Sequence, residues 1–245
     1  MLIIANDSPM KANIKYKIFY IKFLMSLLVS TMHATAQLPV GYRGIPYKDS
    51  VYTGNKLNPF GAQNLPGRVE LAYYDLGGEG IAYHDNTPFN EGALLNQQAG
   101  EVRPGISDHI AFFRENEGVD INYTKDILDF TSSNKAAPKV SQLYVSNQAD
   151  GEWTNYTIYV HQRGKYIINS VYSSVDNQPA ELRVNHQFAC KLIFPVKTGN
   201  LHVWTQSELG EIVFTKPGLY LLTVKFSGGI QFGYLDFLYS EARQK

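Results

Sequence analysis

The sequence predicts an all-β domain, a β-sandwich of the jelly-roll type, from three observations. Apolar and polar residues alternate with a period of two in the second half of the chain, as in strands that bury one face. Glycine and proline turns separate these segments at short intervals, which is typical of a sandwich. No stretch after residue 36 shows a long helical period.

The alternation places the strands along the chain. Within residues 154–160, Tyr156, Ile158 and Val160 share one face and the residues between them share the other,. Further strands are expected over residues 165–172, 181–184, 187–193, 219–226 and 230–239, separated by turns at Gly164, Asn185-His186, Pro217-Gly218 and Gly228-Gly229,. Residues 79–138 are polar and weakly periodic, so we expect a long irregular loop region that wraps one end of the sandwich.

Residues 1–36 have the pattern of a signal peptide. Lysines precede a short apolar run at residues 23–29, and the small-x-small sequence of residues 34–36 fits a cleavage site,. The apolar run is too short for a membrane span, and the lysines disfavour the alternative of a buried N-terminal helix. We therefore expect a secreted protein, periplasmic or extracellular.

The remainder divides into an arm and a domain. Residues 37–65 are rich in Gly, Pro, Asn and Tyr, which is typical of an extended N-terminal arm or linker. Residues 66–240 carry the periodic segments and form the expected sandwich.

Charge and motifs restrict the chemistry. The 22 basic residues balance 22 acidic residues, so no nucleic-acid partner is expected, because phosphate neutralisation needs a basic surplus. The motifs of serine hydrolases, zinc proteases and phosphate-binding loops are absent from the sequence,, and the single Cys190 is expected to be structural. The chain is therefore expected not to be an enzyme. A glycosidase needs only two carboxylates, and residues 79–129 contain several, so a polysaccharide hydrolase stays open.

Several short motifs follow one another in residues 66–239. They are Arg68–Asp75, Gly151–Val160, Gly164–Tyr166, Thr198-Gly199 followed by Trp204, Pro217–Tyr220 and Gly229–Phe237. In this order they resemble carbohydrate-binding module family 6, whose members accompany bacterial polysaccharide-degrading enzymes. The resemblance implies a jelly roll, no catalytic activity, and a cleft for a polysaccharide or oligosaccharide among the loops at one end.

The resemblance also implies which residues contact the sugar. Trp204 corresponds to one of two aromatic faces that hold the ring, and Gln231 corresponds to an amide deeper in the cleft. Trp153 begins a strand within a packing motif, so a core position is favoured for it and a sugar contact is the alternative.

The place of the second aromatic face is occupied by Asn147, which has no ring to stack on a sugar. Candidates to replace the missing ring are Tyr144, Tyr83 and Tyr172. The cleft predicted from the resemblance therefore depends mainly on Trp204.

A structural calcium site is the one cofactor that the resemblance suggests. Of the expected carboxylates, Glu70 is kept, whereas Ala72 and Gly233 stand in place of two others. Asp236 is a further candidate, although strand alternation puts it out of register with Gly233. Calcium needs several oxygen ligands, so the set Glu70 and Asp236 predicts at most a weak site.

Three functions follow from the sequence. The favoured one is non-catalytic binding of a polysaccharide by a secreted module, with an associated glycoside hydrolase as a possible partner. The second is a structural or interaction domain that has lost sugar binding, which the absence of a ring at Asn147 motivates. The third is a hydrolase that uses carboxylates of the irregular region.

Overall fold

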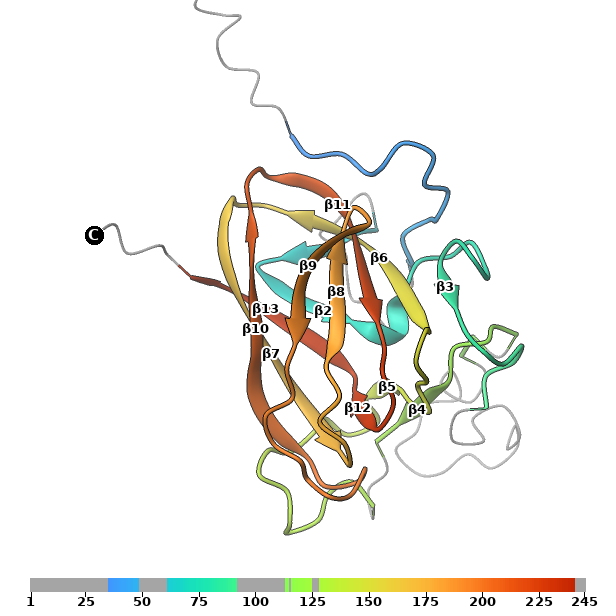
Figure 1. Cartoon of the computed structure of the whole chain (residues 1–245), viewed down its shortest axis with the longest axis vertical. Coiled ribbons are helices and arrows are strands. Elements are labelled where there is room, and N and C mark those ends of the chain that lie inside the picture. Colours follow the sequence, from blue (N-terminus) through green and yellow to red (C-terminus); the bar gives the residue numbers. More distant parts are fainter. Residues whose placement is uncertain (1–34, 49–60, 92–112, 115, 125–127, 241–245) are drawn as a thin grey trace, which may run out of the picture. The chain divides into compact units, whose positions relative to one another are not determined.

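The fold is that of a computed structural model. It describes residues 35–48, 61–91, 113–114, 116–124 and 128–240. In this part of the chain, thirteen strands form two sheets around a shared core (Figure 1), and the one helix is the short 3-10 turn η2 (Leu71–Tyr73). The predicted all-β sandwich is confirmed. Within these residues no helix has the length and apolar character needed to cross a membrane.

The first sheet has six strands. In order across the sheet they are β1 (Gln63–Leu65), β6 (Trp153–Val160), β11 (Gly218–Lys225), β8 (Ala180–Val184) and β9 (Gln187–Leu192), with the short β3 (Tyr83–His84) paired to β6. The β8–β9 hairpin turns at Asn185 and His186, whose φ angles are 48° and 68°. Positive φ at both positions suits the two-residue turn that matches strand twist, so the predicted hairpin is confirmed.

The second sheet has seven strands. In order they are β2 (Gly67–Glu70), β13 (Tyr234–Ser240), β7 (Gly164–Ser174), β12 (Ile230–Phe232), β5 (Leu143–Val145) and β4 (Ile121–Tyr123), with β10 (Thr205–Phe214) paired to β7. The two sheets also meet through their backbones, because the N–H of Ile193, just after β9, donates to the carbonyl of Leu209 in β10 at 2.8 Å.

The core lies between the sheets and follows the predicted alternation. Tyr156, Ile158 and Val160 of β6 are fully buried and belong to the main core cluster. Leu222 and Val224 of the neighbouring strand β11 are buried in the same cluster. The residues between them therefore face away from the core, which leaves the outer face of the six-stranded sheet to polar and aromatic side chains.

Two features of the strands differ from the sequence prediction. No strand was predicted over β10, where a register shift between Glu208 and Gly210 interrupts the alternation,. The predicted strand over residues 230–239 is broken at Gly233 into β12 and β13. A Cβ at Gly233 would lie 2.6 Å from the carbonyl oxygen of Leu143, so this close approach requires glycine.

The predicted arm is part of the folded body rather than a free linker. Within its residues 37–48, Ile45 pairs with Leu76 of the domain, and Ala36, the last residue of the predicted signal peptide, pairs with Gly218. In addition, β1 belongs to the six-stranded sheet although it precedes residue 66. The sandwich therefore begins N-terminal to the predicted boundary. The predicted signal peptide lies almost entirely outside the described residues.

Candidate functional site

Trp204, the expected sugar platform, is buried with only 2% of its surface exposed. It packs in a small cluster with Tyr144, Val171 and Tyr234. These three residues alternate with core residues of β5, β7 and β13, so the cluster lies on the outer face of the seven-stranded sheet,. The expectation of an open ring at Trp204 is therefore wrong for this structure, because a sugar cannot stack on a covered indole.

A loop covers Trp204 and bonds to all its polar groups. The indole Nε1–H donates to Asp129 Oδ1 at 2.8 Å, and the backbone N–H donates to Asn134 Oδ1 at 3.0 Å. The Trp204 carbonyl accepts from the N–H groups of Lys135 and Ala136. Asp129 is itself fully buried and also bonds to His202 Nδ1 at 3.0 Å. These contacts give Trp204 a structural role in fixing the loop.

The other residues predicted for this cleft are closed or dispersed. Tyr144 is fully buried, and its ring meets that of Trp204 edge-on at 5.5 Å between centroids. Gln231 is 5% exposed in β12. Asn147 is exposed but has a positive φ of 50°, in a turn after β5. The structure therefore brings Tyr144 and Trp204 together as packing partners, without an open ring at either residue.

Glu70 and Asp236 do not fit a calcium site. They lie on the same face of the β2–β13 pair, but the residue directly opposite Asp236 is Arg68, while Glu70 stands opposite Tyr234. Both carboxylate oxygens of Asp236 accept from the Arg68 guanidinium at 2.7 Å, so this carboxylate is already neutralised. A carboxylate at the position of Gly233 would collide with Leu143. Within the described residues, no group of three or more His, Cys, Asp or Glu could hold a metal ion.

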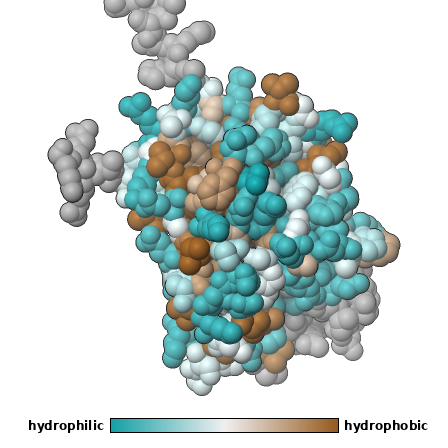
Figure 2. Space-filling model, in the orientation of Figure 1, coloured by the Kyte–Doolittle hydropathy of each residue, from teal (hydrophilic) through white to brown (hydrophobic). Residues whose placement is uncertain are grey.

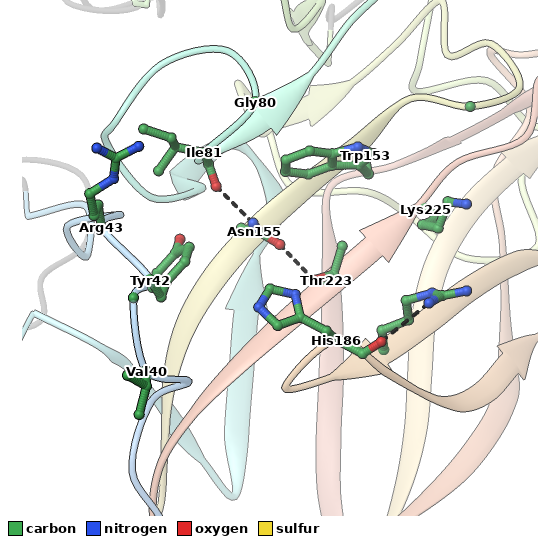
Figure 3. A pocket seen from close by; sticks show the side chains of 13 residues that line it. Val40, Tyr42, Arg43, Gly80, Ile81, Trp153, Asn155, His186, Thr223 and Lys225 are labelled. Atoms are coloured by element: carbon green, nitrogen blue, oxygen red, sulfur yellow. Dashed lines mark hydrogen bonds between the residues drawn. The ribbon is translucent and has the colours of Figure 1, made fainter.

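A hollow lies on the opposite sheet, on the outer face of β6, β11 and β8. It has a volume of about 630 Å³. The residues around it come from the arm, the loop before β3, the three strands and the β8–β9 turn: Val40, Gly41, Tyr42, Arg43, Gly80, Ile81, Gly151, Trp153, Asn155, Arg183, His186, Thr223 and Lys225. Figure 3 shows the arm on one side of the hollow and the strands on the other.

Trp153 lines this hollow, and the sequence analysis gave it as an alternative sugar contact. It stands at the start of β6, half-buried, with its indole among the lining side chains (Figure 3). Its ring lies 6.5 Å from that of His84, in the neighbouring strand β3. The favoured expectation of a core position is not met, because Trp153 shares the outward parity of Asn155 and keeps part of its surface open.

The floor of the hollow is held by a buried polar chain. The Asn155 amide donates to the Ile81 carbonyl at 2.8 Å, and its oxygen accepts from the Thr223 hydroxyl. Asn155 is thereby fixed between β11 and the loop before β3. Since one donor and one acceptor of its amide are bonded within the protein and the residue is only 4% exposed, Asn155 mainly shapes the hollow,.

The arm side of the hollow is anchored through Tyr42. Its hydroxyl donates to Asp75 Oδ2 at 2.7 Å, and Asp75 also accepts from the backbone N–H and the hydroxyl of Thr157. Asp75 is 1% exposed, and burial raises the pKa of its carboxyl while the three donors act against that rise,. Burial and the adjacent carboxyl raise the pKa of the Tyr42 hydroxyl, which therefore stays protonated as a donor.

Two carboxylates of the irregular region and Glu152, directly before β6, have structural partners. Asp85 accepts from the N–H of Thr87, Asp120 from that of Glu91, and Glu152 from that of Ala149. Burial is the main reason why the pKa values of all three carboxyls are raised. These bonds assign the carboxylates to loop structure. Residues 92–112, which contain other acids of the hydrolase hypothesis, lie outside the described residues.

Cys190 is half-buried at the edge of the core. Burial raises the pKa of its thiol to about 11. The thiol is therefore protonated at neutral pH, and a nucleophilic role would need the thiolate.

The sequence analysis did not nominate the residues that surround Trp153. On β6, the alternation that buries Tyr156 also places Asn155 and Trp153 on the other face. This part of the site could therefore have been predicted from the sequence,. The contribution of the arm was not available, because the bond from Tyr42 to Asp75 joins residues 33 positions apart.

Comparisons with known proteins give likenesses in fold only. No protein-family model matches the chain, and no curated protein matches it. Among solved structures, the chain is similar to the module CsCBM6-3 from Clostridium stercorarium in complex with cellobiose, with a TM-score of 0.44 and 10% identity over 74% of this chain and 98% of that one.

Two further structures are similar at the same level. A carbohydrate-binding module of lichenase 5A from Cellvibrio mixtus, in complex with cellotriose, has a TM-score of 0.37 and 15% identity, and covers 50% of this chain and 98% of its own. A family 35 carbohydrate-binding module from Clostridium thermocellum has a TM-score of 0.36 and 18% identity, over 49% and 97%. At such values, the site of this chain has to be assigned from its own residues.

Proposed function

We propose that the chain is a non-catalytic module that binds a polysaccharide or oligosaccharide in the hollow beside Trp153. The observation that carries the proposal is a half-buried indole on the outer face of a rigid sheet, within a hollow of about 630 Å³. A module of this kind would hold an associated glycoside hydrolase near its substrate.

The chemistry of the hollow suits a saccharide. A sugar ring has an apolar C–H face, which stacks on an aromatic ring, and an edge of hydroxyls, which need hydrogen-bonding partners. Trp153 provides the aromatic surface, and Arg183, His186 and Lys225 provide polar groups around it. The volume falls in the range of about 300–1,000 Å³ that is usual for ligand sites. The face of the molecule seen in Figure 2 is largely hydrophilic, with hydrophobic residues in separate patches.

Affinity electrophoresis against a panel of soluble polysaccharides tests the proposal. We expect retardation by at least one polysaccharide, and loss of at least about tenfold in affinity on Trp153→Ala, since a buried tryptophan contact is typically a major part of binding energy. Tyr159→Ala is the matched control, because Tyr159 is a half-buried aromatic on the same strand and the same face but does not line the hollow.

Two outcomes would count against the proposal. If no polysaccharide retards the wild-type protein, sugar binding is wrong. If Trp153→Ala and Tyr159→Ala have equal and small effects while binding persists, the hollow is not the site.

The burial of Trp204 favours a second candidate, an interaction domain that has kept the fold and lost its sugar cleft. The closed cluster around Trp204 shows that one expected cleft is filled by protein. This candidate predicts that the folded protein binds no saccharide of the panel and instead co-purifies with a protein partner through a surface other than the hollow.

We also infer that the signal-like segment is removed during export. Ala36, the last residue of that segment, has its N–H bonded to the Pro217 carbonyl and its carbonyl bonded to the Leu219 N–H. These two bonds tie Ala36 to the domain and do not support cleavage after it; the inference rests on the lysines, the apolar run and the small-x-small sequence of residues 1–36,. N-terminal sequencing of the protein recovered outside the cytoplasm tests the inference, and an intact residue 1 in that fraction would overturn it.

A further inference from the structure

The charged side chains that line the hollow beside Trp153 within the described residues are all cationic. Among the described residues, three cationic side chains line it, those of Arg43, Arg183 and Lys225, and no carboxylate does. The chain as a whole has equal numbers of acidic and basic residues. The positive charge of the hollow is therefore a local arrangement and not a consequence of a basic protein.

Strand register places one of these cations beside the indole. Lys225 of β11 is the direct cross-strand partner of Trp153 in β6, and both point to the outer face of the sheet. Neighbouring strands are about 5 Å apart. A ring that lies on Trp153 would therefore present its substituents to the ammonium group of Lys225.

Arg183 extends the positive surface across the sheet. It occupies the next row, where the cross-strand order runs from Asn155 through Thr223 to Arg183. Its Nε bonds to Glu181, and its Nη1 donates to the His186 carbonyl at 3.2 Å. These bonds fix the guanidinium plane and neutralise part of its charge, while Nη2 has no bond within the described residues.

Lys225 and Arg43, the other two cations of the hollow, form no ion pair within the described residues. Within the described part of the chain, no carboxylate forms an ion pair with Lys225 or with Arg43, although Glu181 stands opposite Lys225 in the register. Lys225 is half-buried and Arg43 is exposed. An unpaired cation that is partly removed from water gains most from an anionic partner.

We infer that the hollow takes an acidic polysaccharide, whose carboxylate or sulfate groups meet Lys225 and Arg183 while a sugar ring stacks on Trp153. This inference rests on the proposed saccharide binding and adds the class of the ligand. Charge-assisted hydrogen bonds from lysine and arginine are the usual means by which proteins hold such groups. Arg43 on the arm faces the same ligand from the other side of the hollow.

Matched pairs of polysaccharides test the inference by calorimetry or affinity electrophoresis. Polygalacturonate is compared with the same polymer after methyl esterification, and a carrageenan is compared with its desulfated form. We expect the charged member of one pair to bind at least about tenfold more tightly, and the difference to shrink between about 50 and 500 mM salt, because salt screens exposed charges. The pair that shows the effect identifies the anionic group.

Single substitutions test which residues cause the preference for the charged polymer. Lys225→Gln should lower affinity for the charged polymer by about fivefold to tenfold, a usual size for one partly desolvated charge pair, and lower affinity for the neutral polymer by a clearly smaller factor, so that the preference for the charged polymer shrinks. Lys197→Gln is the control, since Lys197 is exposed and outside the hollow and the change in net charge is the same. Arg43→Gln is a second test on the arm.

The outcomes separate this inference from the proposed function. Equal binding of charged and neutral polymers, abolished by Trp153→Ala, would leave the saccharide site in place and overturn the acidic ligand. Absence of binding to every polymer would overturn both. Equal losses from Lys225→Gln and Lys197→Gln would show non-specific charge attraction, and tighter binding of a single-stranded oligonucleotide than of either acidic polymer would also overturn the inference.

Discussion

The two tryptophans of this chain lie on the outer faces of opposite sheets, and the chain treats them differently. Trp204 is 2% exposed beneath a loop that bonds to its indole and its backbone. Trp153 is only partly buried. The arm beside it bonds to the rest of the domain mainly through residues other than Trp153. Whether an aromatic residue on a sheet is packing or a binding surface is decided by what covers it, and the cover comes from distant parts of the chain.

The largest effect that tests this comparison is expected from Trp204→Ala. It removes a buried ring and leaves the buried Asp129 without the indole donor. We expect a loss of about 3–5 kcal/mol in the free energy of unfolding, measured by urea titration, as for other buried aromatic truncations. The folded fraction should keep its saccharide affinity.

The same measurement on Trp153→Ala provides the contrast. Since Trp153 is half-buried, we expect a stability loss of about 1–2 kcal/mol, well below that of a core truncation, together with the loss of binding described above. Equal stability losses for the two variants, or loss of binding only in Trp204→Ala, would reverse the roles assigned to the two residues.

The fold could be predicted from the sequence because strand alternation is a local pattern. The segments that cover or leave open the two tryptophans come from distant parts of the chain and could not be predicted. The period of two in β6 correctly grouped Tyr156, Ile158 and Val160 on one face, and this face is buried in the core. The bond between Asp129 and Trp204 spans 75 positions, and no pattern around Trp204 indicates it. A family motif suggested an exposed ring there, and the loop that fills that space in this chain lies in a region too irregular for alternation to describe.

The side of the molecule that carries β4 has a pH dependence of its own. Burial raises the pKa of Asp120, just before β4, to about 6, against about 3.9 in an unfolded chain. The folded state therefore binds this proton more tightly, and the contribution of Asp120 to stability, fully present below about pH 4, is lost as the pH rises through 6.

Asp120→Asn tests that sign, because the amide keeps the acceptor for the Glu91 N–H without the charge. We expect the variant to be more stable than the wild type by about 1–3 kcal/mol at pH 7.5 and equally stable near pH 4, from the size of the pKa difference. Denaturant titrations at both pH values measure it. A variant that is less stable at pH 7.5 would show that the ionised carboxylate is favourable in the fold.

Tyr42→Phe examines the open side, where a single hydroxyl anchors the arm to the buried Asp75. Loss of one donor to a buried carboxyl should cost about 1–2 kcal/mol. Because Tyr42 and Arg43 wall the hollow, saccharide affinity should also fall, by a smaller factor than in Trp153→Ala. Unchanged affinity, measured by calorimetry on the folded protein, would mean that the arm does not contribute to the site.

Calcium is expected to have the smallest effect on the unfolding temperature. The test concerns the seven-stranded sheet, against whose outer face Trp204 packs. Arg68 occupies both oxygens of Asp236 and also lies over the Tyr234 ring at 3.4 Å, so a cation would have to displace a guanidinium from a carboxylate and an aromatic face at once. A ligand that binds only the folded state raises the unfolding midpoint, by an amount that grows with the logarithm of its concentration relative to its dissociation constant. Thermal unfolding in excess calcium and in excess chelator should therefore give the same midpoint to within about 1 °C. A rise of several degrees in calcium that Asp236→Asn abolishes would mean that Arg68 gives way, and that this face binds a metal rather than holding an ion pair.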